Sequence, residues 1–177
     1  MCSSDLTTRT AGFNTVDIAS FSQAGLFFAM LLMFIGASPG STGGGIKTTT
    51  TFALLLSLGS LMFRRESAAF KRKVGGESIL KAFQVLLLSF LVVLFGSLSL
   101  LLIEGETYDF MAVLFETVSA FATVGLSCGI TPTLSTLSKV VIVLIMFAGR
   151  VGPITIATSL KAKSSHLGYI EEQVFIG

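Results

Sequence analysis

A short motif and the apolar segment after it occur twice in this chain, 113 residues apart and without a gap. Gly12 and Gly125 hold the same place in the two copies, each two residues after a threonine, Thr10 or Thr123. Further pairs of identical residues keep this offset: Leu31 and Leu144, Met33 and Met146, Phe34 and Phe147, and Gly36 and Gly149. Because a repeat constrains the architecture before any local feature does, we expect one unit built twice, a Thr-x-Gly loop followed by an apolar helix.

The composition predicts that these units lie in a lipid bilayer. Hydrophobic residues make up 52% of the chain and charged residues only 12%, about half the charge of an average soluble domain. Residues 78–103 and 137–160 each reach the roughly 20 apolar residues that a membrane-spanning helix needs. A third span is interrupted, because 21–35 and 51–63 are apolar and 36–45 are not. None of these segments alternates as a strand would, so we predict an all-α membrane protein.

The charges of the connecting segments predict the orientation. Lysine and arginine are concentrated in residues 64–77 and after residue 160, whereas Glu104, Glu106 and Asp109 open the loop at 104–136. Basic loops stay in the cytoplasm, so residues 64–77 and the C-terminus are predicted to be cytoplasmic and 104–136 external. Both Thr-x-Gly loops then lie on the outer side. The three acidic residues could concentrate cations there, although a solvated loop is the simpler interpretation.

Residues 108–122 are apolar but too short to cross a bilayer, and they lead directly into the second Thr-x-Gly loop. Non-helical backbone at membrane depth is tolerated only where protein or a water-filled cavity surrounds it. We therefore expect 108–122 to be a re-entrant pore helix, with an interfacial amphipathic helix as the alternative. Glu116 in this helix would brace the loop or bond to a neighbouring backbone group.

The two loops have the character of an ion-selectivity filter. A potassium ion without its water shell needs several oxygen dipoles at fixed distance, and backbone carbonyls supply them. Glycine can take the positive-φ geometry that lets adjacent carbonyls face the same way. The predicted filter residues are Thr10, Ala11, Gly12, Phe13, Asn14, Thr123, Val124, Gly125, Leu126 and Ser127. The ion is expected at the carbonyls of Thr10, Ala11, Gly12, Thr123, Val124 and Gly125.

The interruption at residues 36–47 holds five glycines and a proline, which cost a helix about 1 and 3 kcal/mol each. Its end, Lys47-Thr48, resembles that of a phosphate-binding loop, but Ile46 replaces the required glycine and no strand precedes it. A cytoplasmic linker would leave 51–63 as an unpartnered half-span. The favoured interpretation is an intramembrane loop that gates an ion pathway. The predicted gate residues are Gly36, Ser38, Pro39, Gly40, Gly43, Gly44, Gly45, Lys47 and Arg150.

Arg150 is included because it lies eleven residues from both Lys139 and Lys161. In a continuous helix that is about 16 Å from either end. A charge at such depth costs at least about 2.5–3.5 kcal/mol unless it meets water or a partner. The repeat offset pairs Arg150 with Ala37, so we expect the arginine and the glycine-rich loop at one depth below the filter. There it would either raise the barrier to cation passage or hydrogen-bond to the loop carbonyls.

Residues 8–15, 36–48 and 147–153 together resemble the Trk/Ktr/HKT superfamily of potassium transporters, and most closely the bacterial Ktr-type membrane subunit. The resemblance extends over essentially the whole chain. It implies four helix–pore helix–helix repeats around one pathway, with Gly12 and Gly125 as filter glycines of the third and fourth repeats. It also implies a homodimer of full-length chains in the bacterial inner membrane, regulated by a cytoplasmic nucleotide-binding subunit.

Because the chain holds one complete repeat and part of another, we expect the C-terminal portion of a transporter whose N-terminal repeats are missing. The expected organisation is a third-repeat filter and broken helix at 1–63, a basic linker at 64–77, a fourth repeat at 78–160 and a cytoplasmic tail at 161–177. We expect potassium uptake, with no enzyme activity, no cofactor and no nucleic-acid partner. Sodium as the transported or coupling ion, and a non-transporting fragment with a role in assembly, stay open as alternatives.

Overall fold

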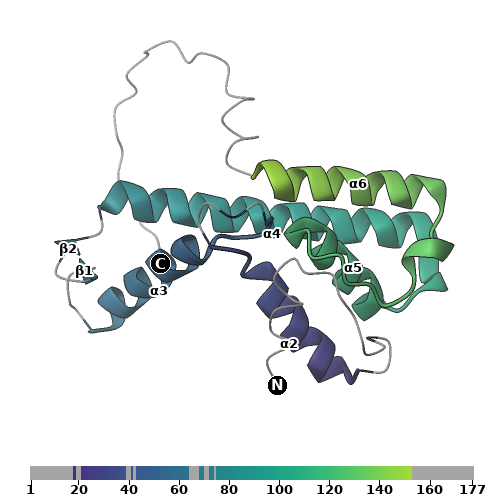
Figure 1. Ribbon diagram of the computed structural model, residues 1–177, viewed down its shortest axis with the longest axis horizontal. Helices are drawn as coiled ribbons and strands as arrows, with labels where there is room; N and C mark the ends of the chain where they lie inside the picture. The colour runs from purple at the N-terminus through teal and green to yellow at the C-terminus, as the bar shows by residue number, and fades with distance from the viewer. Residues whose placement is uncertain are drawn as a thin grey trace, which may run out of the picture.

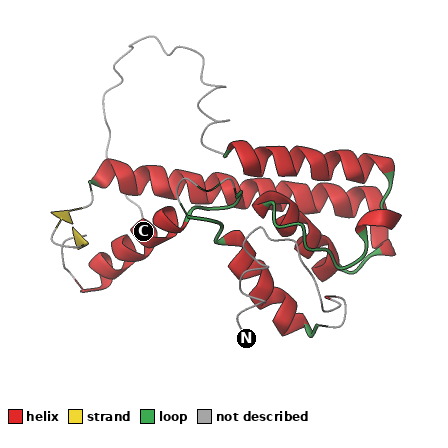
Figure 2. Ribbon diagram, in the orientation of Figure 1, coloured by secondary structure: helices red, strands yellow, loops and turns green. Residues whose placement is uncertain are grey.

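The computed structural model describes residues 18, 21–38, 41, 43–63, 68–69, 72–73 and 75–152. Within them the long elements are all helices: α2 (Gln23–Phe34), α3 (Thr48–Phe63), α4 (Gly76–Glu104), α5 (Phe110–Ala122) and α6 (Thr136–Val151) (Figure 1). Two 3₁₀ turns, η3 (Gly105–Thr107) and η4 (Thr131–Thr133), flank α5 and its loop. A two-residue antiparallel ribbon, β1 (Ala68–Ala69) with β2 (Arg72–Lys73), lies in the basic segment (Figure 2). The predicted all-α class is confirmed.

The sequence repeat appears in the structure as two helices with the same start. Helices α2 and α6 begin 113 residues apart, directly after Ser22 and Ser135. Each serine caps its helix: Ser22 Oγ accepts from the Gly25 N–H at 3.2 Å, and Ser135 Oγ accepts from the Ser138 N–H at 3.3 Å. Such a cap satisfies one of the amide groups that a helix leaves free at its N-terminus. The two copies therefore share a local structure as well as a motif.

Helices α4 and α6 run antiparallel side by side, and α5 packs against both of them and against α2 (Figure 1). The segment 105–135 connects the end of α4 to the start of α6, and both of these lie at the same end of the helix pair. Glu104, the last residue of α4, fixes that end, because its Oε1 accepts from the Ser135 N–H at 2.9 Å and from Ser138 Oγ at 2.5 Å. Every residue from Phe115 to Ala122 in α5 is buried. Helix α5 therefore lies in the centre of the described structure, within a segment that begins and ends at one end of the α4–α6 pair.

Helix α4 is the one helix of the described part that is long and apolar enough to cross a membrane. Helices α2 and α5 are apolar but shorter. Large side chains on the outer faces of the helices stay exposed, among them Phe90, Phe95 and Phe147. An exposed apolar surface of this extent is typical of a protein that lies in lipid.

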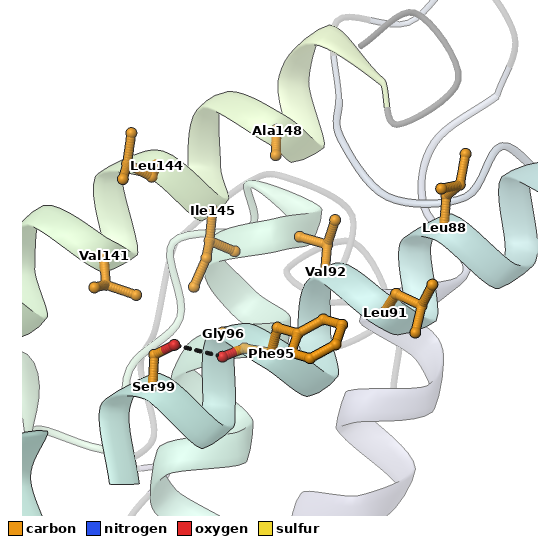
Figure 3. A pocket seen from close by; sticks show the side chains of 10 residues that line it. All are labelled: Leu88, Leu91, Val92, Phe95, Gly96, Ser99, Val141, Leu144, Ile145 and Ala148. Carbon is orange, nitrogen blue, oxygen red and sulfur yellow. Dashed lines mark hydrogen bonds between the residues drawn. The ribbon is translucent and has the colours of Figure 1, made fainter. Parts of the chain in front are cut away.

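Glycines let the helices approach closely at two places. A Cβ atom added at Gly96 of α4 would lie 2.6 Å from Ile145 Cδ1 of α6 (Figure 3). A Cβ atom added at Gly149 of α6 would overlap the carbonyl oxygen of Phe121 at the end of α5. Beside the first contact, a groove of about 350 Å³ is lined by Leu88, Leu91, Val92, Phe95, Gly96, Ser99, Val141, Leu144, Ile145 and Ala148.

The predicted helix at 137–160 differs from the structure at its C-terminal side. Helix α6 ends at Val151, and Gly152 has φ 88° and ψ 132°, which no α-helix contains. The run from 137 to 160 is therefore not one continuous helix, and Arg150 lies in the last turn of α6. The predicted tail at 161–177 and the first 17 residues lie outside the described residues.

We predict that Gly149→Ala destabilises the protein, because the overlapping atom belongs to backbone that cannot rotate away. Overpacking of this kind costs about 1–3 kcal/mol. Gly59→Ala in α3 is the matched control, since an added Cβ there meets nothing within 4 Å. The measurement is the thermal unfolding midpoint of each variant in detergent at one heating rate. Equal midpoints for Gly149→Ala and Gly59→Ala would contradict the packing described here.

Candidate functional site

The predicted second filter loop begins with a sharp turn at the end of α5. Thr123 caps the helix in the left-handed region, at φ 54°, and its N–H donates to Ala120 O at 3.1 Å. The Val124 N–H donates to Ser119 O at 3.0 Å. Gly125 follows with φ 84°. A left-handed non-glycine residue costs about 1–2 kcal/mol, so the surrounding contacts hold the chain in this turn.

Helix α5 also binds the loop with a side chain. Ser119 Oγ donates to the carbonyl oxygen of Leu126 at 2.6 Å. No residue in the described part donates a hydrogen bond to the three preceding carbonyls, those of Thr123, Val124 and Gly125. Gly125 is exposed, whereas Val124 and Leu126 are buried. Within the described part, the loop therefore presents three consecutive carbonyls without a hydrogen-bond donor, and the fourth is fixed to α5.

Glu116, one turn before Ser119, contacts the segment beyond the filter. Its Oε1 accepts from Ser127 Oγ and, at 3.1 Å, from the Cys128 N–H. Its Oε2 accepts from Thr131 Oγ1 at 3.0 Å. The structure contains features of both interpretations of Glu116, because the carboxylate bonds to the Cys128 backbone and also to the side chains of Ser127 and Thr131.

The glycine-rich interruption between α2 and α3 forms a closed loop. At its base the Gly36 N–H donates to Ile46 O at 2.8 Å. Lys47 folds back over the loop, and its Nζ donates to Ser41 O at 3.0 Å and to Gly43 O at 2.6 Å. Among the described residues, Lys47 has no acidic partner; it donates instead to two backbone carbonyls of the loop.

This loop reaches the end of the pore helix. The Gly44 N–H donates to Thr123 Oγ1 at 2.9 Å. A Cβ atom at Gly44 would lie 2.8 Å from the carbonyl oxygen of Phe121, the oxygen that Gly149 also approaches. The predicted gate loop and the end of α6 therefore converge on the C-terminal end of α5, at the start of the predicted filter.

The structure brings together several predicted site residues that are far apart in the sequence. Gly44 meets Thr123, and Arg150 directly follows Gly149, although its exposed side chain lies in the last turn of α6 and not at the middle of a continuous helix. The first filter copy, Thr10 to Asn14, and the gate residues Pro39 and Gly40 lie outside the described residues.

One alternative for the glycine-rich loop is wrong. A phosphate-binding loop follows a strand, but α2 precedes this loop, and Lys47 is engaged by carbonyls of the loop itself. Ser119 was not predicted as a site residue, and Thr123 was predicted for its carbonyl and not for its hydroxyl. The spacing of Glu116 and Ser119, three residues apart on one helix face, was the available signal for Ser119.

The comparisons with known proteins show the family of the chain. A family model described as TrkH, a cation transport protein, matches residues 4–167. The chain belongs to this family. The resemblance to the Trk/Ktr/HKT superfamily is thereby confirmed, and because the family consists of transport proteins, so is the expectation that the chain is not an enzyme. A cation transport protein acts across a membrane, which agrees with the length and composition of α4.

Individual relatives match almost the whole chain. The Ktr system potassium uptake protein B of Bacillus subtilis is 41% identical over 174 residues, which cover 97% of this chain and 39% of the relative. The potassium/sodium uptake protein NtpJ of Enterococcus hirae is 38% identical over 179 residues, covering 97% and 40%. The chain thus spans about two fifths of the length of these curated relatives.

A solved structure has the same fold. The crystal structure of the potassium transporter TrkH from Vibrio parahaemolyticus superposes with a TM-score of 0.67 at 24% identity, over 88% of this chain and 35% of that chain. At this identity the likeness supports the fold, and the roles of individual residues rest on the geometry described above.

We predict that Thr123→Val speeds amide hydrogen exchange at Gly44 by about fivefold, because the amide loses its hydroxyl acceptor. Thr123→Ser is the matched control, since serine keeps that acceptor. The measurement is hydrogen–deuterium exchange of peptides spanning residues 43–47 in detergent. Equal exchange in the valine and serine variants would show that this contact does not hold the loop.

Proposed function

We propose that this chain contributes filter loops and a gate to a pathway for potassium uptake across a bacterial cell membrane. The observation that carries the proposal is the run of three carbonyls, from Thr123 to Gly125, that no described residue engages. Consecutive backbone carbonyls can replace the water shell of a potassium ion without a charge that would retain it. The carbonyl of Leu126 closes the run, because Ser119 occupies it.

The orientation of α5 favours a cation at this place. A helix carries about half a negative elementary charge at its C-terminus, where carbonyls are left free. The C-terminal end of α5 is Ala122, directly before the filter. The helix dipole therefore adds to the attraction of the loop carbonyls for a positive ion.

The gate in this proposal is the loop that contains Gly36, Gly43, Gly44 and Gly45, together with Arg150. Its closed form is supported by the bond from Gly44 to Thr123 and by the two bonds from Lys47. A fixed positive charge near the pathway raises the barrier for a cation. Ions pass down their electrochemical gradient when the loop moves away from Thr123.

The remaining components come from outside the chain. Because the chain spans about two fifths of its relatives, we propose that N-terminal repeats complete the ring of filter loops. A homodimer of full-length chains in the cell membrane and a cytoplasmic nucleotide-binding regulatory subunit belong to the same proposal, and the latter agrees with relatives named as proteins of a Ktr system.

Sodium remains a second candidate ion. The Enterococcus relative is named a potassium/sodium uptake protein, and at 38% identity it resembles this chain as closely as the Ktr system potassium uptake protein B of Vibrio alginolyticus does. A non-transporting role in assembly is the remaining alternative.

The proposal is tested by uptake in a bacterium without its own potassium transporters. The chain is expressed alone and as a chimera in which it replaces the matching part of the Bacillus relative. We predict that the chimera restores growth on low potassium, that Gly125→Asp abolishes this because a carboxylate enters the filter, and that Gly129→Asp retains most of it. Gly129 is a control for backbone strain, because it has a positive φ of 88° like Gly125 at 84°, while an added Cβ there meets nothing within 4 Å.

Failure of the chimera in the membrane to restore growth would contradict the proposal and favour the assembly role. If the Gly125→Asp chimera restored growth as well as the parent chimera, the filter would have to lie elsewhere. Growth restored by the chain alone would show that several copies of this chain can form a pathway without the N-terminal repeats.

For the gate, we predict that Arg150→Ala in the chimera raises the initial rate of rubidium uptake about tenfold, because removing the positive charge lowers the barrier by about 1.4 kcal/mol. Lys139→Ala, which removes an exposed cation from the opposite end of α6, serves as control. An unchanged or lower rate in Arg150→Ala would count against a barrier role.

A further inference from the structure

Among the side chains that the structure describes, Glu116 is the only buried carboxylate, with 5% of its surface exposed. It lies in helix α5, which precedes the proposed filter, and it is not one of the filter residues. Burying a charge is costly unless hydrogen bonds compensate for the lost water. Its place in the centre of the fold therefore calls for a specific role.

The partners of this carboxylate all belong to the segment that follows the filter. Besides the bonds from Ser127, Cys128 and Thr131, Ser127 Oγ lies 3.1 Å from Thr131 Oγ1 and accepts from the Gly129 N–H at 2.9 Å. One carboxylate thus accepts hydrogen bonds from residues before and after Gly129. Three protein donors take up most of the roughly four acceptor positions of the carboxylate, so Glu116 is engaged mainly with this segment.

Hydrogen bonds contribute to holding the loop from this side. A cavity of about 170 Å³ borders it, and its lining includes Glu116, Gly125, Leu126, Ile142 and Met146. This volume exceeds what a single water molecule needs. Because the loop borders open volume here, its bonds to Glu116 and Ser119 contribute to fixing its position.

We propose that Glu116 is a positioning residue that sets the geometry of the filter and thereby the preference for potassium over sodium. This proposal rests on the proposed transport function. Glu116 fixes the chain after Leu126, and Ser119 fixes Leu126 itself, so the two side chains hold the outer end of the filter at a set distance from α5. Charge-assisted hydrogen bonds are suited to this because they are shorter and stronger than neutral ones.

The first test compares Glu116→Ala and Glu116→Gln in the chimera by potassium uptake, with sodium as competitor. The alanine variant leaves three donors without an acceptor, so we expect the KM for potassium to rise about tenfold and the preference over sodium to fall. Glutamine can accept from Ser127 and Cys128 with its oxygen and donate to Thr131 with its nitrogen. We expect it to stay within about threefold of the parent. Glu77→Ala, in an exposed pair with Lys81, is the control.

The second test does not depend on transport and uses the 177-residue chain in membranes. With Cys2→Ser, the remaining thiol belongs to Cys128, whose amide is held by Glu116. We expect thiol reagents to modify Cys128 about tenfold faster in Glu116→Ala and at nearly the parent rate in Glu116→Gln. If Glu116→Ala does not fold, Ser127→Ala and Thr131→Val each remove one donor and are measured in its place.

The outcomes separate the two proposals. Parental KM, ion preference and Cys128 reactivity in Glu116→Ala would overturn the positioning role. A glutamine variant as impaired as the alanine variant would also overturn it, since charge and not position would then be decisive. If the parent chimera transports nothing, the proposed function fails, whereas the reactivity of Cys128 still decides whether Glu116 holds the loop.

Discussion

The backbone that follows α5 has to find hydrogen-bond partners without water, because the helix ends in the centre of the molecule. Unsatisfied backbone groups at membrane depth cost several kcal/mol each. The structure meets this constraint with groups of α5 itself: Ser119 binds the carbonyl of Leu126, and Glu116 binds the segment beyond it. Among the described residues, none donates a hydrogen bond to the three carbonyls in between. The arrangement that holds this loop is therefore also the one that leaves the proposed ion site.

The same end of α5 connects the loop to the rest of the fold. Gly44 from the interrupted helix and Gly149 from α6 both approach the carbonyl of Phe121, and Thr123 accepts a hydrogen bond from the Gly44 amide. Side chains at these glycines would separate the three elements. A movement of the glycine-rich loop is thereby linked to the first residue of the filter through one hydrogen bond, which gives the proposed gate a direct contact with the element that it would control.

Much of this architecture could be predicted from the sequence, because it depends on local patterns. The repeat correctly predicted two helices with a common start, and the apolar run at 78–103 corresponds closely to α4. What could not be predicted depends on contacts between distant residues. The bond between Gly44 and Thr123 joins residues 79 apart, and no periodicity reveals it. The end of α6 at Gly152 was missed because apolar residues continue on both sides of this glycine. The first filter copy and the roles of the site residues stay predictions.

The central claim is that the carbonyls of Thr123, Val124 and Gly125 bind the transported ion. It is tested most directly by anomalous X-ray scattering from crystals of the chimera grown with rubidium or thallium in place of potassium. The account predicts an anomalous peak within coordination distance of these carbonyls, and none in the cavity beside Glu116. A peak coordinated by Glu116, or the absence of any peak along the loop in crystals of a chimera that transports, would contradict it.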